Sequence, residues 1–91
     1  MSPENPDPFA PGRILQGVVV EHHPWGVELR LEEEDAYGTV DIIYLDDDSA
    51  RWGPAGYPAI GTVCQAVVQG MMPSGQLRLS LRQSDLREAA D

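Results

Sequence analysis

The sequence predicts an all-β fold, a closed barrel of five short strands in one domain. Short segments alternate apolar and polar side chains with the period of two that half-buried strands show. Turns rich in glycine and proline separate these segments. The chain has 91 residues, enough for one domain with a modest core.

The first two expected strands form the centre of this prediction. Residues 13–21 contain a β-branched run, and residues 25–31 alternate strictly. Residues 22–24, two histidines and a proline, are expected to interrupt the chain between them. Gly26 follows Trp25 at the head of the second strand, where a bulge would help to close a small barrel. The apolar positions that define the second strand are Val27, Leu29 and Leu31.

Three further strands are expected at residues 37–45, 62–70 and 77–82. Gly75 lies in a turn before the last of them, as a hairpin requires. Residues 46–60 are expected to form a loop with at most one helical turn, because prolines and glycines interrupt them. Within this loop, the segment from Trp52 to Pro58 is expected to fold down and plug one end of the barrel.

The two ends of the chain differ in composition from the barrel. Residues 1–11 are rich in proline and are expected to form a disordered arm. Residues 83–91 form a polar tail that could be a short helix, with Ser84 as a candidate N-cap. Residues 12–82 therefore form the domain. Five strands, a long irregular connection between strands three and four and glycines at the corners predict a barrel of the OB type.

The charge distribution is strongly asymmetric. The chain carries fifteen acidic residues, six arginines and no lysine, with a formal net charge of −9. Residues 1–48 hold twelve of the acids and two of the arginines. This balance opposes general binding to polyanions, because non-specific affinity for nucleic acid depends on basic contacts that release counterions.

A reducing, non-membrane environment is expected. Cys64 is the only cysteine, which excludes an intramolecular disulfide, and its predicted inward position suits a small apolar residue. The chain has no signal-like segment at its start and no apolar stretch of membrane-spanning length. We therefore expect a cytoplasmic protein with no membrane partner.

The order and spacing of short motifs across residues 11–82 resemble the S1 RNA-binding domain of ribosomal protein S1 and polynucleotide phosphorylase. The closing Gly75-Gln-Leu-Arg-Leu-Ser-Leu-Arg82 is the most characteristic part. The other elements of the resemblance are Gly12-x-Ile14, Gly17-x-Val19, Trp25-Gly26-Val27-x-Leu29, Gly38-x-Val40 and Gly61-x-x-Cys64-x-Ala66-x-Val68. The resemblance implies an OB fold and an association with RNA.

The resemblance also implies which positions would face RNA. Trp25 matches the aromatic residue that precedes the glycine of strand two. Other positions depart from the family pattern. A second aromatic, a strand-three histidine, a strand-four lysine and the acidic and basic residues beside the last hairpin are replaced by Glu28, Asp41, Val67, Met72 and Gln76, respectively.

Two orientations of Trp25 remain open at this stage. Plain alternation places it inward with Val27, whereas a bulge at Gly26 would turn it outward. Arg78 and Arg82 are expected on one face of strand five, where they could contact phosphate or pair with acidic side chains. With Trp25 and Arg30, these arginines are the candidate nucleic-acid contacts.

No metal, cofactor, small-molecule substrate or catalytic site is expected. His22 and His23 are adjacent, so in a strand they would point to opposite faces and could not easily share one ion. The acidic runs fit no EF-hand spacing. The chain shows no nucleophile with a suitably spaced base and no phosphate-binding glycine loop, so we do not expect an enzyme.

Two hypotheses of function follow. The first is a module that binds single-stranded RNA through Trp25 and the arginines. The second is an acidic adaptor that has lost RNA binding and recognises a basic protein partner. The residues assigned to the second hypothesis are Glu28, Asp41, Val63, Val67 and Met72.

Overall fold

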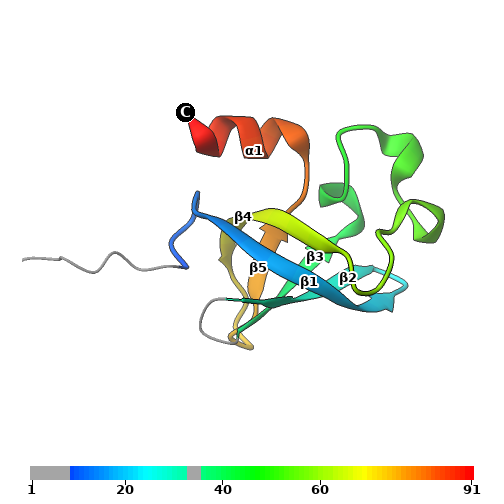
Figure 1. Ribbon diagram of the computed structural model, residues 1–91, viewed down its shortest axis with the longest axis horizontal. Helices are drawn as coiled ribbons and strands as arrows, with labels where there is room; N and C mark the ends of the chain where they lie inside the picture. The colour runs from blue at the N-terminus through cyan, green and yellow to red at the C-terminus, as the bar shows by residue number, and fades with distance from the viewer. Residues whose placement is uncertain (1–8, 33–35) are drawn as a thin grey trace, which may run out of the picture.

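A computed structural model describes residues 9–32 and 36–91, so most of the predicted N-terminal arm lies outside the described residues. Five strands close into a barrel in the order β1, β2, β3, β5, β4 (Figure 1). All neighbouring strands are antiparallel except β3 and β5, which are parallel. The predicted five-stranded OB-type barrel is confirmed. The strands are β1 (Ile14–His23), β2 (Gly26–Leu31), β3 (Tyr37–Asp41), β4 (Val63–Met71) and β5 (Leu77–Ser80).

The barrel interior is filled by the inward positions of the alternating strands. On β2, for example, Val27, Leu29 and Leu31 are completely buried, whereas Arg30 between them is exposed. Burial of such side chains is the main favourable contribution to folding. The other buried members of the core are Leu15, Val19, Val40, Leu45, Ala66, Val68, Leu77 and Leu79.

The first two strands join more tightly than the sequence predicted. β1 continues through His23, which pairs with Gly26 across a turn formed by Pro24 and Trp25. The predicted interruption at residues 22–24 is therefore wrong for the two histidines. The irregularity that was expected at Gly26 lies in β1 instead, where Val20 is the extra residue between two registered pairs.

The third strand ends at Asp41, four residues before the predicted end at Leu45. Its partner β2 begins at Gly26, which pairs with Asp41, so no strand remains for residues 42–45 to join. The chain turns instead into a 3₁₀-helix, η1 (Ile42–Tyr44). The following connection contains two more such turns, η2 (Ser49–Arg51) and η3 (Pro54–Gly56), rather than at most one.

The C-terminal segment forms a helix, α1 (Gln83–Ala90), which packs on the outside of the barrel (Figure 1). Its N-cap is Arg82 and not Ser84. The helix lies beside β4, and Val67 shares a cleft there with Asp85 and Ala89. Val67 faces away from the barrel interior but is only 4% exposed because α1 covers it, so it is not available as the predicted contact for a protein partner.

Among the described residues, no helix has the length and apolar character needed to cross a membrane.

Candidate nucleic-acid interface

Three strands present a common outer surface, which we call the β2-β3-β5 face. Residues that pair across neighbouring strands project from the same side of a sheet. Glu28 pairs with Thr39, which in turn pairs with Arg78, while Arg30 pairs with Tyr37. Together with Asp41, these residues make up the face: Glu28, Arg30, Tyr37, Thr39, Asp41 and Arg78.

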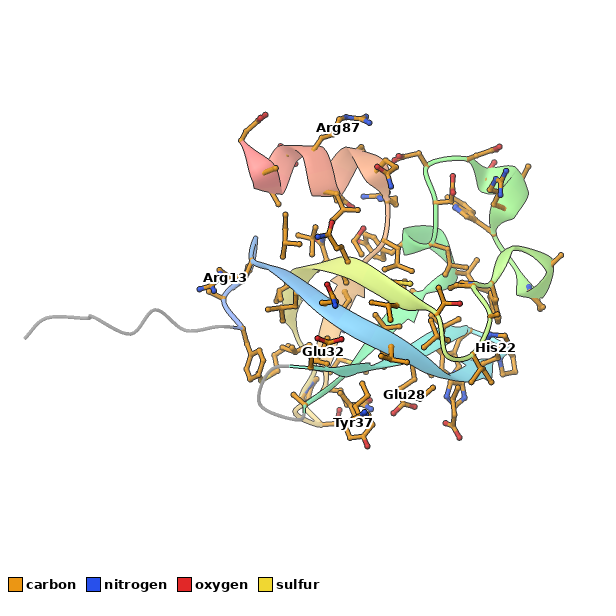
Figure 2. The ribbon with its side chains drawn as sticks, viewed as in Figure 1. Arg13, His22, Glu28, Glu32, Tyr37 and Arg87 are labelled. Carbon is orange, nitrogen blue, oxygen red and sulfur yellow. The ribbon has the colours of Figure 1, made fainter. Side chains whose placement is uncertain are left out.

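This face is not covered by the C-terminal helix. In Figure 2, Glu28 and Tyr37 project from the side of the barrel opposite Arg87, which lies on α1. Tyr37 is 44% exposed, and Arg30, Asp41 and Arg78 are also exposed. The face is therefore accessible to a ligand.

Trp25 lies at one end of this face and points outward. Its side chain is 42% exposed, and its ring stacks on that of His23, with ring centroids 4.6 Å apart and an interplanar angle of 6°. The tight turn between β1 and β2 produces this orientation. The next residue, Gly26, is buried with a φ of 152°, and a Cβ at that position would overlap the carbonyl oxygen of Val40.

Tyr37 provides a second exposed aromatic ring, and the sequence reasoning did not select it. The sequence could have identified it, because alternation along the strand places Tyr37 on the same face as Thr39 and Asp41. Gly26 pairs with Asp41 and Arg30 with Tyr37, so Trp25 and Tyr37 lie toward opposite ends of the face. Four residues of strand separate these two registered pairs, which corresponds to roughly 13 Å.

Met72 covers the middle of the face. The Thr39 hydroxyl donates to Met72 Sδ at 3.5 Å and to the Leu77 carbonyl at 3.4 Å. Thr39 is consequently only 6% exposed, although it lies on an outer position of β3. Val63, by contrast, pairs with Val18 on β1 and is 56% exposed away from this face. The residues proposed for a protein partner are therefore not all brought together.

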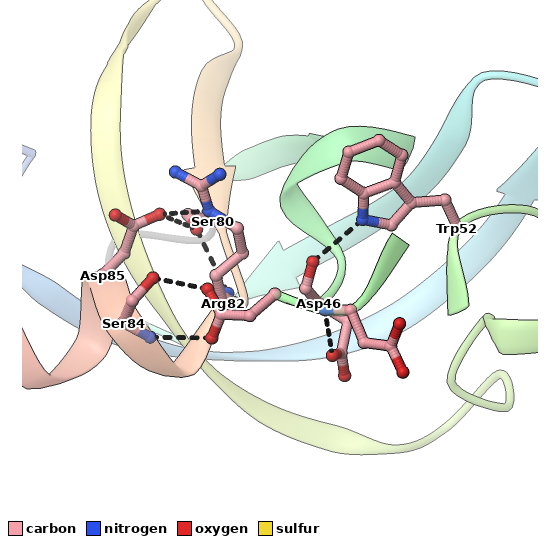
Figure 3. A network of polar contacts seen from close by, with 8 residues as sticks. Asp46, Trp52, Ser80, Arg82, Ser84 and Asp85 are labelled. Atoms are coloured by element: carbon pink, nitrogen blue, oxygen red, sulfur yellow. Dashed lines mark hydrogen bonds and ion pairs between the residues drawn. The ribbon is translucent and has the colours of Figure 1, made fainter. Parts of the chain in front are cut away.

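Arg82 does not belong to the face. β5 ends at Ser80, so the prediction that Arg78 and Arg82 lie on one face of this strand is wrong. Arg82 Nε donates to Asp85 Oδ2 at 2.8 Å (Figure 3). The Arg82 guanidinium also lies 4.8 Å from the centroid of the Tyr44 ring. The hydrogen bond to Asp85 raises the pKa of the Arg82 guanidinium.

The same network attaches α1 to the barrel. The Ser80 hydroxyl donates to Asp85 Oδ2 at 2.6 Å, and the Ser84 hydroxyl and backbone N–H both donate to the Asp47 carboxylate. The hydrogen bond from Arg82 lowers the pKa of Asp85, and the hydrogen bonds from Ser84 lower that of Asp47. The helix is therefore held by the connection between β3 and β4 as well as by β5.

The predicted plug is formed only in part. Tyr57 packs against the core and its hydroxyl donates to the His23 carbonyl at 2.5 Å. Trp52 is 39% exposed, and its indole Nε1 donates to the Asp46 carbonyl at 2.9 Å (Figure 3). Tyr57 thus supports the turn that carries Trp25, whereas Trp52 lies on the surface.

Comparison with known proteins places this barrel among solved structures. No protein-family model and no curated protein matches the chain. A chain in the complex of a/eIF2alpha, aDim2p and rRNA from Pyrococcus horikoshii OT3 matches with a TM-score of 0.72 and 23% identity. GSP13 from Bacillus subtilis matches with a TM-score of 0.70 and 23% identity. The chain shares the fold of these solved structures, a five-stranded barrel of the OB type.

The chain spans little more than half the length of these two neighbours. The match to the Pyrococcus complex covers 96% of this chain and 52% of the other, and that to GSP13 covers 84% and 58%, respectively. RNase R from Mycoplasma genitalium matches at 17% identity with a TM-score of 0.61, covering 77% of this chain and 13% of the enzyme.

The charge of the β2-β3-β5 face differs from that of the whole chain. Arg30 and Arg78 are matched on it by Glu28 and Asp41, so the face is formally neutral although the chain carries −9. Most of the acidic excess therefore lies elsewhere. A polyanion approaching this face would meet both attractive and repulsive groups at close range.

A cluster beside Trp25 was also missed by the sequence reasoning. Glu21, His23 and Glu28 bring their ligand atoms within 4.8 Å of one another. The sequence reasoning considered the neighbouring pair His22 and His23, which do not act together. His22 Nε2 instead lies 2.7 Å from the Pro58 carbonyl oxygen. The relevant pattern was Glu21-x-His23 facing Glu28 across a hairpin, which depends on a register that the sequence did not reveal.

Proposed function

We propose that this S1-like domain is a non-enzymatic module that binds single-stranded RNA on the β2-β3-β5 face. The observation that carries the proposal is the pair of exposed aromatic residues, Trp25 and Tyr37, on a face that also holds Arg30 and Arg78. Exposed aromatic rings stack on bases, and arginines contact phosphates; surfaces that bind single strands combine the two.

The comparisons support this choice of ligand. The matched chain from Pyrococcus horikoshii comes from a complex that contains rRNA, and a matched protein from Streptococcus pneumoniae is described as a multidomain protein with nucleic acid binding domains. The OB barrel itself uses this part of its surface for oligonucleotides.

The magnitudes favour weak binding. Stacking contributes about 1 to 3 kcal/mol for each base. Each repulsive contact between a phosphate and Glu28 or Asp41 costs about 1 kcal/mol in water. Two arginine contacts of similar size offset this repulsion, so two stacked bases leave about 2 to 6 kcal/mol, which corresponds to weak binding.

Fluorescence titration with a mixed single-stranded RNA at low salt tests the proposal. We use the variant Trp52→Phe, so that Trp25 is the only tryptophan. Saturable quenching is expected in this protein. In the wild-type background, RNA binding is measured by the anisotropy of labelled RNA. There Trp25→Ala should weaken binding about 5- to 150-fold, as the loss of one stacked base predicts. Trp52→Ala is the matched control and should bind like wild type. Equal binding by the Trp25→Ala protein would contradict the proposal.

A basic protein partner is the second candidate. The acidic excess and the presence of Glu28, Asp41 and half-buried Met72 on the face favour it. The double substitution Glu28→Gln with Asp41→Asn separates the two candidates. It should strengthen RNA binding, because two repulsive charges are removed, and should weaken binding of an arginine-rich peptide. RNA binding by the wild type that the double substitution strengthens favours the first candidate. No RNA binding, together with peptide binding that the double substitution weakens, favours the protein partner.

A further inference from the structure

We propose that Glu21, His23 and Glu28 form a surface site for one divalent transition-metal ion of the zinc class. His23 Nε2 lies 3.1 Å from Glu21 Oε1 and 3.3 Å from Glu28 Oε1. The inference does not depend on RNA binding, because it concerns the hairpin of β1 and β2 alone.

The strand register explains why these three groups meet. Glu21 and Glu28 are direct cross-strand partners, and His23 lies two residues beyond Glu21 on the same face of β1. Like charges directly opposite each other in a sheet are destabilising. His23 Nε2 lies close to both carboxylates, and a neutral imidazole carries at most one proton on that nitrogen to share between them. A bound cation would compensate both charges at once.

The separations suit zinc coordination. Zn²⁺ binds imidazole nitrogen at about 2.0–2.1 Å and carboxylate oxygen at about 2.0–2.2 Å, usually in a tetrahedron, whose ligand atoms then lie about 3.4 Å apart. The distances of 3.1 and 3.3 Å between Nε2 and the two oxygens are close to this value. Three protein ligands leave the fourth position for water.

The chemistry of the donor set selects among ions. Calcium and magnesium prefer sites made of oxygen donors alone, whereas an imidazole nitrogen favours zinc and its neighbours in the transition series. We therefore expect Zn²⁺ to bind and Mg²⁺ to compete poorly.

Two of the three ligands are held in place. The exposed fractions of the His23 and Glu28 side chains are 28% and 19%, and the His23 ring is stacked on Trp25. The Glu21 side chain is 62% exposed and moves more freely. An ion on His23 Nε2 would lie beside the stacked ring pair, so the emission of Trp25 should respond to it.

Isothermal titration of the RNA-free protein with Zn²⁺, in a buffer that does not coordinate metals, tests the inference. One ion per chain is expected to bind. His23→Gln and Glu28→Gln should each lower the affinity at least about tenfold, the loss typical when the surroundings of a metal ligand are disturbed. His22→Gln is the matched control and should bind like wild type, because His22 is engaged with Pro58.

Two-dimensional NMR of the histidine rings gives the second readout. Zn²⁺ should shift the ring resonances of His23 and leave those of His22 in place. Circular dichroism confirms that each variant is folded. Absence of saturable binding to the wild-type protein would overturn the inference. The inference would also be overturned if His22→Gln and His23→Gln lowered the Zn²⁺ affinity equally. Unchanged Zn²⁺ binding by both His23→Gln and Glu28→Gln would overturn it as well.

Discussion

Gly26 is the residue that determines how closely the turn carrying Trp25 approaches β3. Its positive φ and the adjacent carbonyl oxygen of Val40 leave no room for a side chain. A backbone hydrogen bond also joins this turn to the end of β3, because the Ile42 N–H donates to the Trp25 carbonyl at 2.9 Å. Trp25 is therefore fixed by the main chain rather than by packing of its own ring into the core.

Gly26→Ala should lower the free energy of unfolding by more than about 2 kcal/mol, because a buried Cβ would force the two strands apart. Urea denaturation followed by circular dichroism measures the change. Gly70→Ala in β4 is the matched control. A Cβ at Gly70 meets nothing within 4 Å, so this change should stay within about 0.5 kcal/mol of wild type. Similar losses in both proteins would argue against the steric explanation.

At the scale of the elements, α1 is attached by a few polar contacts rather than by a large apolar surface. None of its residues is buried. Asp85 accepts from both Arg82 and Ser80, and Asp47 accepts from Ser84 at the beginning of the helix. Carboxylates near a helix N-terminus also interact favourably with its dipole. The attachment of the helix should therefore depend on the ionisation of these acids.

The pKa of Asp85 is lowered in the folded protein, chiefly by the hydrogen bond from Arg82. The stability that this group contributes is complete above the ordinary aspartate pKa of about 4 and is lost as the pH falls through the lowered folded value. Asp85→Asn should destabilise the protein at neutral pH, and its effect should shrink as the pH falls through the lowered folded pKa of Asp85. Thermal unfolding at a series of pH values measures this. A constant difference between variant and wild type across the series would contradict the assignment.

The elements also show where sequence reasoning succeeded. Alternation correctly identified β2 and its apolar positions Val27, Leu29 and Leu31, because the pattern of burial there is local. It failed for residues 42–45, which have strand-forming side chains but no partner strand beyond Gly26. Val67 was assigned outward correctly for a bare sheet, and α1 then covered it.

The candidate site was predicted less completely than the fold. The predicted residues Trp25, Arg30 and Arg78 lie on or beside the β2-β3-β5 face, and their contacts with RNA stay a prediction. Tyr37 was available from the period of its strand. The cluster around His23 was not available, because it depends on the displaced register at Val20, a feature that only the paired strands define.

At the scale of the whole molecule, a neutral face lies within an acidic chain. Binding of RNA to this face would rely on two arginines, Arg30 and Arg78, rather than on a broad basic surface. Stacking, which salt does not screen strongly, would then supply most of the affinity.

The salt dependence of RNA binding should therefore be shallow. Two phosphate contacts predict a slope of about −1.4 in a plot of log affinity against log salt concentration for a single strand. Arg78→Gln should reduce this slope by about half, whereas Arg87→Gln on α1 is the matched control and should leave it unchanged. Anisotropy titrations at several salt concentrations supply the values. A slope several times steeper would show that other basic groups carry the binding.

The central claim is that the β2-β3-β5 face is the surface that binds RNA. Chemical-shift mapping of the ¹⁵N-labelled protein during addition of a short single-stranded RNA tests it most directly. The shifted amides should cluster on β2, β3 and β5 and around Trp25, with Val63 and α1 unaffected. Shifts concentrated on α1 or around Val63, or no shifts at high RNA concentration, would contradict it.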